Sequence, residues 1–123
     1  MVDGDRVVAE EPVVVAARAA DAKSGVDTVI LDVGPLLGIT GHFLITSAGN
    51  SRLVRTLAEE IERVVADSCG LKPIRVEGLD ALRWVLIDYG DFVVHIFRTE
   101  EREFYDLERL WADVARVEWN EQS

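Results

Sequence analysis

Hydrophobic residues recur along this chain with two spacings, and each spacing predicts one kind of element. Short β-branched runs, or runs in which apolar and polar residues alternate, are typical of strands. They occur at residues 27–34, 42–48, 73–78, 84–88 and 91–97. Apolar residues three and four positions apart, and alanine-rich segments, predict helices. These occupy residues 12–25, 51–69 and 99–114.

The second and third predicted helices have recognisable ends and apolar stripes. Asn50 or Ser51 can cap the second helix and Gly70 can end it. Its expected buried stripe is Leu53, Leu57, Ile61, Val64 and Val65. Thr99 is the expected cap of the third helix. The apolar stripe of that helix is Phe104, Leu107, Trp111 and Val114.

The order of these elements predicts an α/β fold with a mixed five-stranded sheet and flanking helices. A strand, a long helix and a further strand form a crossover, so 42–48 and 73–78 should run parallel. Strands 84–88 and 91–97 are joined by a tight turn and should be antiparallel. We expect one domain over residues 1–123, with an ordered core at about 13–114 and looser ends.

The hairpin formed by 84–88 and 91–97 has two different faces. With Tyr89-Gly90 as its loop, Asp88 pairs with Asp91, Leu86 with Val93 and Trp84 with His95. One face is then wholly apolar and consists of Val85, Ile87, Phe92, Val94 and Ile96. The other is mixed and consists of Trp84, Leu86, Asp88, Asp91, Val93, His95 and Phe97.

The mixed face has two interpretations. Aromatic and apolar residues beside carboxylates are typical of the core and rim of a protein interface. Alternatively, the last helix covers the Trp84 end and leaves the carboxylates in solvent. The residue types alone leave both interpretations open.

Charge narrows the class of partner. The net charge is −10, from 23 acidic and 13 basic residues. Such a chain repels phosphate backbones, so we expect little direct contact with nucleic acid and favour a basic protein as partner. The acidity could also serve solubility alone. A single cysteine, Cys69, excludes an internal disulfide. We find no membrane or targeting signal and expect a cytoplasmic protein.

The residues that could carry chemistry do not converge. Asp88 and Asp91 could share a proton or hold a metal, but aspartate is also common beside turns, which is the interpretation we favour. His95 has no second histidine or cysteine at ligand spacing, so we expect no metal site. The turn "SAGNSR" could receive an anion, although an ordinary strand-to-helix turn explains it. We therefore expect no catalytic residue, no cofactor and no enzyme activity.

Three stretches together resemble the ribosome silencing factor family, also called the Iojap or RsfS family. They are "EGLDALRWVLIDYGDFVVHIF", "REFYDLERLWADV" and "FLITSAGNSRLVRTLAEEIE". The family pattern contains E-G, a tryptophan, D-Y-G-D and V-V-H in the first, and R-x-F-Y-x-L-E-x-L-W in the second. The chain departs from that pattern at Gly41-His42, at Ser47-Ala48 and at Leu53.

The resemblance implies a fold similar to the nucleotidyltransferase fold, without the G-S and D-x-D pair that holds nucleotide and metal. It implies binding to the large ribosomal subunit, through basic ribosomal protein number fourteen, on the surface that faces the small subunit. Subunit joining would be blocked by bulk, and translation repressed under nutrient limitation or in stationary phase. The expected partner-binding residues are Trp84, Leu86, Asp88, Tyr89, Asp91, His95 and Arg109. The alternatives are a nucleotide-binding or nucleotidyltransferase-like enzyme and a self-associating module, for instance a homodimer.

Overall fold

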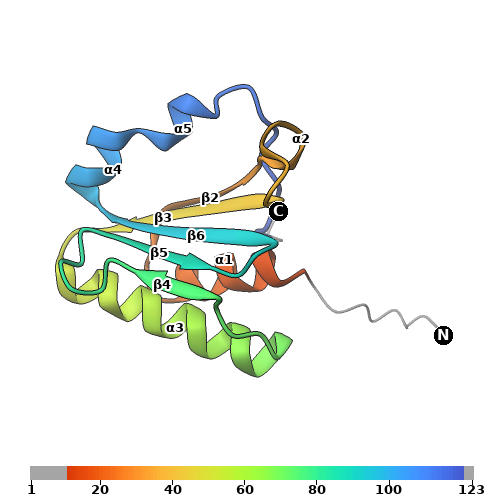
Figure 1. Cartoon of the computed structure of the whole chain (residues 1–123). Helices are drawn as coiled ribbons and strands as arrows, with labels where there is room; N and C mark the ends of the chain where they lie inside the picture. The colour runs from red at the N-terminus through yellow and green to blue at the C-terminus, as the bar shows by residue number, and fades with distance from the viewer. Residues whose placement is uncertain (1–10, 121–123) are drawn as a thin grey trace.

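A mixed sheet with helices on both faces organises the chain (Figure 1). The computed structural model describes residues 11–120. The helices are α1 (Pro12–Ala22), α2 (Gly34–Leu37), α3 (Ser51–Cys69), α4 (Thr99–Tyr105) and α5 (Leu107–Leu110). The strands are β2 (Val26–Asp32), β3 (His42–Ala48), β4 (Arg75–Glu77), β5 (Trp84–Asp88) and β6 (Phe92–Arg98).

The five strands lie in the order β2-β3-β6-β5-β4. Strands β3 and β6 are parallel, and the other neighbouring pairs are antiparallel. The predicted mixed five-stranded sheet is therefore confirmed. The predicted common direction of β3 and β4 also holds, but the crossover through α3 passes over two strands, so the parallel neighbour of β3 is β6. The likeness to the nucleotidyltransferase fold stays a prediction.

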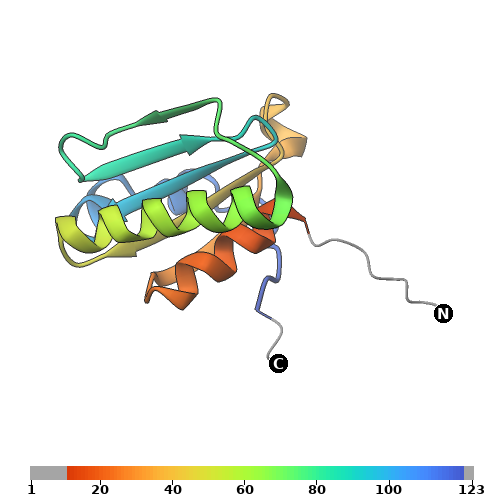
Figure 2. The ribbon, with the colours of Figure 1, turned by 90° about the horizontal axis from the view of Figure 1, so that it is seen from below.

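Helices α1 and α3 lie together on one face of the sheet (Figure 2). Small residues of α1, among them Ala16 and Ala20, are fully buried in this layer. The helix α3 is capped by Asn50, whose side chain accepts from the Leu53 amide at 2.9 Å, and it ends at Gly70 with a φ of +69°. Its buried stripe is Val54, Leu57, Ala58, Ile61 and Val65. The prediction that Leu53 is buried was wrong, since its side chain is 39% exposed and Val54 takes that place.

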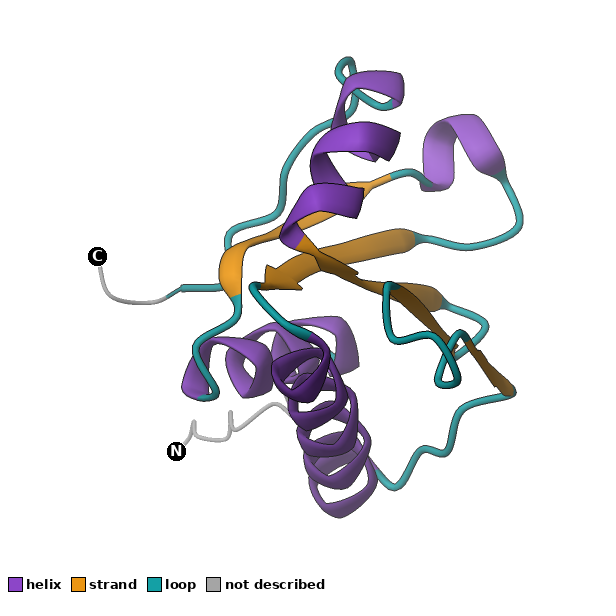
Figure 3. Cartoon of the chain, turned by 90° about the vertical axis from the view of Figure 1, so that its left-hand side faces the viewer, coloured by secondary structure: helices purple, strands orange, loops and turns teal. Residues whose placement is uncertain are grey.

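Helices α4 and α5 lie on the opposite face (Figure 3). A single helix over 99–114 was predicted, and this was wrong because Asp106 adopts a φ of +50° and separates α4 from α5. Phe104 is 80% exposed, whereas Leu107 packs on the core with its neighbours Trp111 and Val114. Thr99 is not the cap of α4, since its hydroxyl donates to the Ala48 carbonyl at 3.3 Å.

Residues that follow α5 run along the outer edge of β2. The Asp32 amide donates to the Ala115 carbonyl, and the Val117 amide donates to the Ile30 carbonyl, both at 2.9 Å. The Trp119 indole donates to the Thr28 carbonyl at 3.0 Å. Residues 115–119 are therefore hydrogen-bonded to the sheet. The sequence predicts an ordered core at about 13–114 with looser ends, and of those ends residues 1–10 and 121–123 lie outside the described residues.

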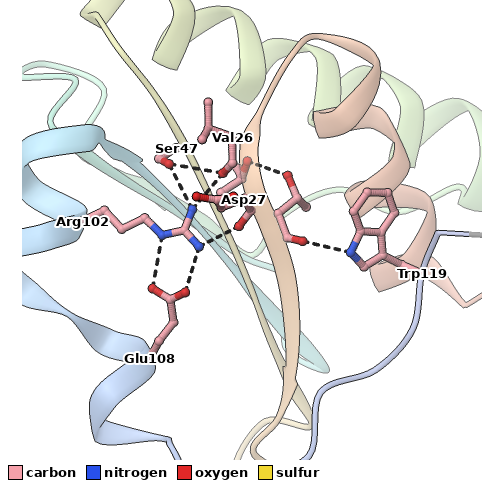
Figure 4. Close-up of polar contacts among 8 residues, drawn as sticks. Val26, Asp27, Ser47, Arg102, Glu108 and Trp119 are labelled. Atoms are coloured by element: carbon pink, nitrogen blue, oxygen red, sulfur yellow. Dashed lines mark hydrogen bonds and ion pairs between the residues drawn. The ribbon is translucent and has the colours of Figure 1, made fainter.

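The guanidinium of Arg102 ties α4 and α5 to the edge of the sheet (Figure 4). It donates to the carbonyls of Val26 and Asp27 at 2.8 and 2.6 Å and to the Ser47 hydroxyl at 3.0 Å. It also forms two hydrogen bonds with the carboxylate of Glu108, at 2.9 and 3.2 Å. The Arg102 side chain is only 10% exposed, although its two carbonyl partners lie at the exposed edge of the sheet. We call this group the Arg102 clasp.

Gly78 is the position where the chain leaves β4 and meets the backbone of β5. Its φ is +93°, and a Cβ there would overlap the carbonyl of Trp84. We expect Gly78→Ala to lower the free energy of unfolding by at least about 2 kcal/mol, because strain and overlap add. Urea denaturation measures it. Gly49→Ala is the matched control, since a Cβ there meets nothing within 4 Å; equal losses in both variants would contradict the assignment.

Removing the Arg102 clasp should loosen the α4–α5 layer. We expect Arg102→Leu to lower the free energy of unfolding by about 3 kcal/mol, because Glu108 and two carbonyls lose their charged partner. Hydrogen exchange across 99–114 should accelerate as well. Arg63→Leu is the control, since Arg63 forms an exposed ion pair with Glu60 and should change stability by less than about 0.5 kcal/mol. Unchanged exchange in Arg102→Leu would show that the clasp does not hold the layer.

Candidate functional site

The hairpin of β5 and β6 turns at Gly90-Asp91. Trp84 pairs with Phe97, Leu86 with His95 and Asp88 with Val93. The predicted register was wrong by two residues, because the loop is Gly90-Asp91 and not Tyr89-Gly90. The Asp88 carboxylate accepts from the Gly90 amide at 2.8 Å and stabilises this loop. Gly90 supplies the positive φ, +88°. An even shift leaves every side chain on its predicted face.

The helix-facing side of the hairpin is the apolar core that was predicted. Its residues are Val85, Ile87, Phe92, Val94 and Ile96, none more than 3% exposed. They belong to the same cluster as the buried stripes of α1 and α3. This side of the hairpin therefore has no surface to offer a partner.

The opposite side, which we call the hairpin face, consists of Trp84, Leu86, Asp88, Val93, His95 and Phe97. Phe97 is fully buried and His95 is 5% exposed, whereas the other four are half-buried. The Trp84 ring packs on Phe97 and on Tyr105 of α4, at centroid distances of 4.8 and 4.7 Å. The C-terminal layer thus covers the Phe97 end and leaves Trp84 and Leu86 partly open, which combines the two interpretations of this face.

A groove of about 320 Å³ continues the hairpin face away from α4. Phe43, Leu86, Val93 and His95 line it, together with Leu37, Ile39 and Thr40 on one side and Ile74 and Arg75 on the other. Ile39 and Ile74 on its two sides are 82% and 70% exposed. Apolar side chains this exposed, around an apolar groove, are typical of an interaction surface. We call it the hairpin groove.

His95 lies in the hairpin groove with only one of its ring nitrogens satisfied. Its Nδ1 accepts a hydrogen bond from the Trp84 indole at 3.1 Å. Since an indole nitrogen can only donate, the imidazole proton is on Nε2, and Nε2 is buried without a partner. Burial lowers the pKa of His95 to about 4, so the ring is neutral at physiological pH.

The two carboxylates of the hairpin turn do not form a paired acid site. Asp88 accepts from the Gly90 amide and lies 3.7 Å from the Arg75 guanidinium. Asp91 is exposed, and its backbone carbonyl accepts from the Gly41 amide at 2.8 Å. Across residues 11–120, no group of three histidine, cysteine or acidic side chains is placed to hold a metal ion.

Tyr89 and Arg109, the remaining residues expected to bind a partner, lie apart from the hairpin face. Tyr89 is 9% exposed and stacks on Phe92 on the helix-facing side. Burial, with smaller contributions from Glu62 and Cys69, raises the pKa of Tyr89 to about 12. Arg109 is exposed on α5. The structure therefore groups Trp84, Leu86, Asp88 and His95, with Asp91 at the turn, and a partner role for Tyr89 or Arg109 stays a prediction.

Parts of the site were not recognised in the sequence. Residues 37, 39, 40, 74 and 75 complete the hairpin groove, and each comes from a connecting segment whose position depends on the tertiary fold. The Arg102 clasp was missed as well, because its carbonyl partners are about 75 residues away in the sequence. Three apolar residues at positions 36, 37 and 39 of a glycine-rich loop were the available signal.

The neutral state of His95 should make stability depend on pH. The unfolded chain binds a proton at this position below about pH 6.5, and the folded chain only below about 4. The contribution to stability is thus complete above the unfolded pKa and is lost as the pH falls toward 4. Between pH 7.5 and pH 5, wild type should lose about 2 kcal/mol more than His95→Gln in urea denaturation. Parallel pH profiles would contradict a buried neutral imidazole.

The chain matches the family model described as "Ribosomal silencing factor during starvation" over residues 8–123. It is 40% identical over 99 residues to the ribosomal silencing factor RsfS of Bacillus subtilis, a match that covers 80% of this chain and 83% of that protein. A crystal structure of a protein from Chromobacterium violaceum superposes with a TM-score of 0.79 at 28% identity, over 86% of this chain and 88% of that one.

A mouse relative is more distant, at 31% identity over 87 residues, which are 69% of this chain and 38% of that protein. It is named "Mitochondrial assembly of ribosomal large subunit protein 1". No helix within residues 11–120 has the length and apolar character needed to cross a bilayer. The family model covers nearly the whole chain, and the protein therefore belongs to the ribosomal silencing factor (RsfS) family.

Proposed function

We propose that this chain binds the large ribosomal subunit through the hairpin face and the hairpin groove, and that its bulk prevents the small subunit from joining. One observation carries the proposal: Trp84 and Leu86 stay partly exposed beside the carboxylate of Asp88, on a part of the sheet that α4 does not seal. Membership in the family of silencing factors supports the ribosome as the target. The name of the mouse relative supports the large subunit.

The partner on that subunit is a basic ribosomal protein, number fourteen. A chain with a net charge of −10 is attracted to a basic protein and repelled by the surrounding RNA. Asp91 at the hairpin turn is exposed and adds to this attraction. Long-range charge raises the rate of encounter, and burial of Trp84 and Leu86 then slows dissociation.

The effect is steric, so the protein acts as a regulator and makes or breaks no bond. A carboxylate that already accepts a backbone amide, as Asp88 does, holds the loop in place and presents the apolar residues beside it. The result is repression of translation when nutrients are limiting or in stationary phase.

Sedimentation of purified subunits at physiological salt tests the proposal. Wild type should travel with large subunits and reduce the yield of joined ribosomes when small subunits are added. Trp84→Ala should weaken binding by at least about 30-fold, because truncating a central aromatic residue costs about 2 kcal/mol or more. Asp91→Lys should slow association and reduce its dependence on salt.

Glu59→Lys is the matched control for Asp91→Lys. It makes the same change of charge at an exposed position of α3, on the other side of the sheet. It should bind within about twofold of wild type once salt screens the difference in net charge. Failure of the wild-type protein to sediment with large subunits would refute the proposal, and so would equal losses in the two lysine variants.

A further inference from the structure

We propose that the hairpin groove binds an extended main-chain segment of a basic protein, with the Nε2–H of His95 donating to a carbonyl and the hydroxyl of Thr40 accepting from an amide. This inference rests on the proposed function and specifies the chemistry of its partner. Two polar atoms within one apolar groove carry it.

Both atoms are buried without a partner. The Nε2 of His95 and the Oγ1 of Thr40 have no hydrogen bond within the described part of the chain, and both residues line the hairpin groove. Leaving a buried polar group unsatisfied costs about 1–3 kcal/mol, so native proteins do this rarely. Five buried side-chain atoms of the described residues have no hydrogen-bond partner, and two of them belong to residues that line the hairpin groove. A segment that enters the groove and moves the side chains around these two atoms slightly apart would complete their hydrogen bonds.

The two groups are complementary to a peptide unit. The Trp84 indole occupies Nδ1 of His95 and so fixes Nε2 as the donor. The hydroxyl of Thr40 can accept. A peptide unit offers one carbonyl and one N–H, whereas an ammonium group or a carboxylate could satisfy only one of the two.

The segment should be extended because a helix uses its own peptide groups internally. In an extended chain, alternate side chains point to opposite sides. One of them can then enter the apolar part of the groove against Phe43, Leu86 and Val93. The exposed side chains of Ile39 and Ile74 flank the segment on its two sides.

The charge around the groove favours a basic segment. Arg75 is the cation in the lining, and it lies 3.1 Å from the carboxylate of Glu77 and 3.7 Å from that of Asp88. Asp88 also lines the groove, so the charges of Arg75 and Asp88 in the lining balance. Glu77 beside Arg75, the exposed Asp91 at the hairpin turn and the net charge of −10 make the surroundings of the groove acidic.

Titration of the ¹⁵N-labelled full chain with a synthetic peptide tests the inference. The probe is acetyl-Lys-Val-Arg-Val-Lys-amide, compared with its backbone N-methylated form and with acetyl-Glu-Val-Glu-Val-Glu-amide. The basic peptide should shift the amides of Phe43, Leu86 and Val93 and the imidazole Nε2 signal of His95. The N-methylated and the acidic peptides should each bind at least about tenfold more weakly. No shift with the basic peptide would overturn the inference.

Two sets of variants separate recognition of the main chain from a structural effect. Thr40→Val should bind the basic peptide about tenfold more weakly and lose its preference over the N-methylated form. Thr56→Val, on the exposed surface of α3, should retain both. His95→Gln keeps an N–H donor and should bind more tightly than His95→Leu. A full preference for the unmethylated peptide in Thr40→Val, or equal binding by the two His95 variants, would overturn the inference.

Sedimentation with large subunits distinguishes this inference from the proposed function. If wild type and Thr40→Val sediment equally well, the ribosomal proposal stands and the role of Thr40 in it is refuted. If wild type fails to sediment, the ribosomal proposal falls, and the peptide titration alone decides what the hairpin groove binds.

Discussion

Five hydrogen bonds of Arg102 hold α4 and α5 over part of the sheet face that lies opposite α1 and α3. The rest of that face stays open. These bonds hold the two helices above β2, β3 and the end of β6, where Phe97 is buried. The Arg102 side chain is 10% exposed, so leaving its charge without these partners would cost free energy, and the bonds therefore favour this position of the two helices. The covered part ends at Trp84, and the hairpin groove begins beyond it.

In the open part of the sheet face, Trp84 and His95 each make both a polar contact and an aromatic contact. Trp84 packs on Tyr105 of the covering layer and donates to His95 in the groove. His95 in turn lies 4.7 Å from the ring of Phe43, which reaches the groove from β3. Trp84 therefore connects the covering layer at Tyr105 to His95, and through His95 to Phe43.

Much of this arrangement was predictable because sheets impose a period of two. Side chains alternate between the two faces of a strand, so the face of each hairpin residue follows from its position in the sequence. The predicted faces were therefore correct although the register was wrong. Local signals also fixed the long helix between Asn50 and Gly70. What failed depended on distant partners: the break at Asp106, the exposure of Phe104 and the groove wall at residues 37, 39 and 40. No spacing within a short segment encodes those contacts.

The indole of Trp84 keeps Nε2 of His95 as a hydrogen-bond donor, because it donates to the other ring nitrogen. Ordinary surface histidines change charge between pH 6 and 7, so a groove built on one would change from a neutral to a charged donor over that range. In this chain the pKa of His95 is about 4, and the indole holds its free proton on the groove side. The hairpin groove consequently offers the same hydrogen-bond donor from neutral pH down to about pH 5.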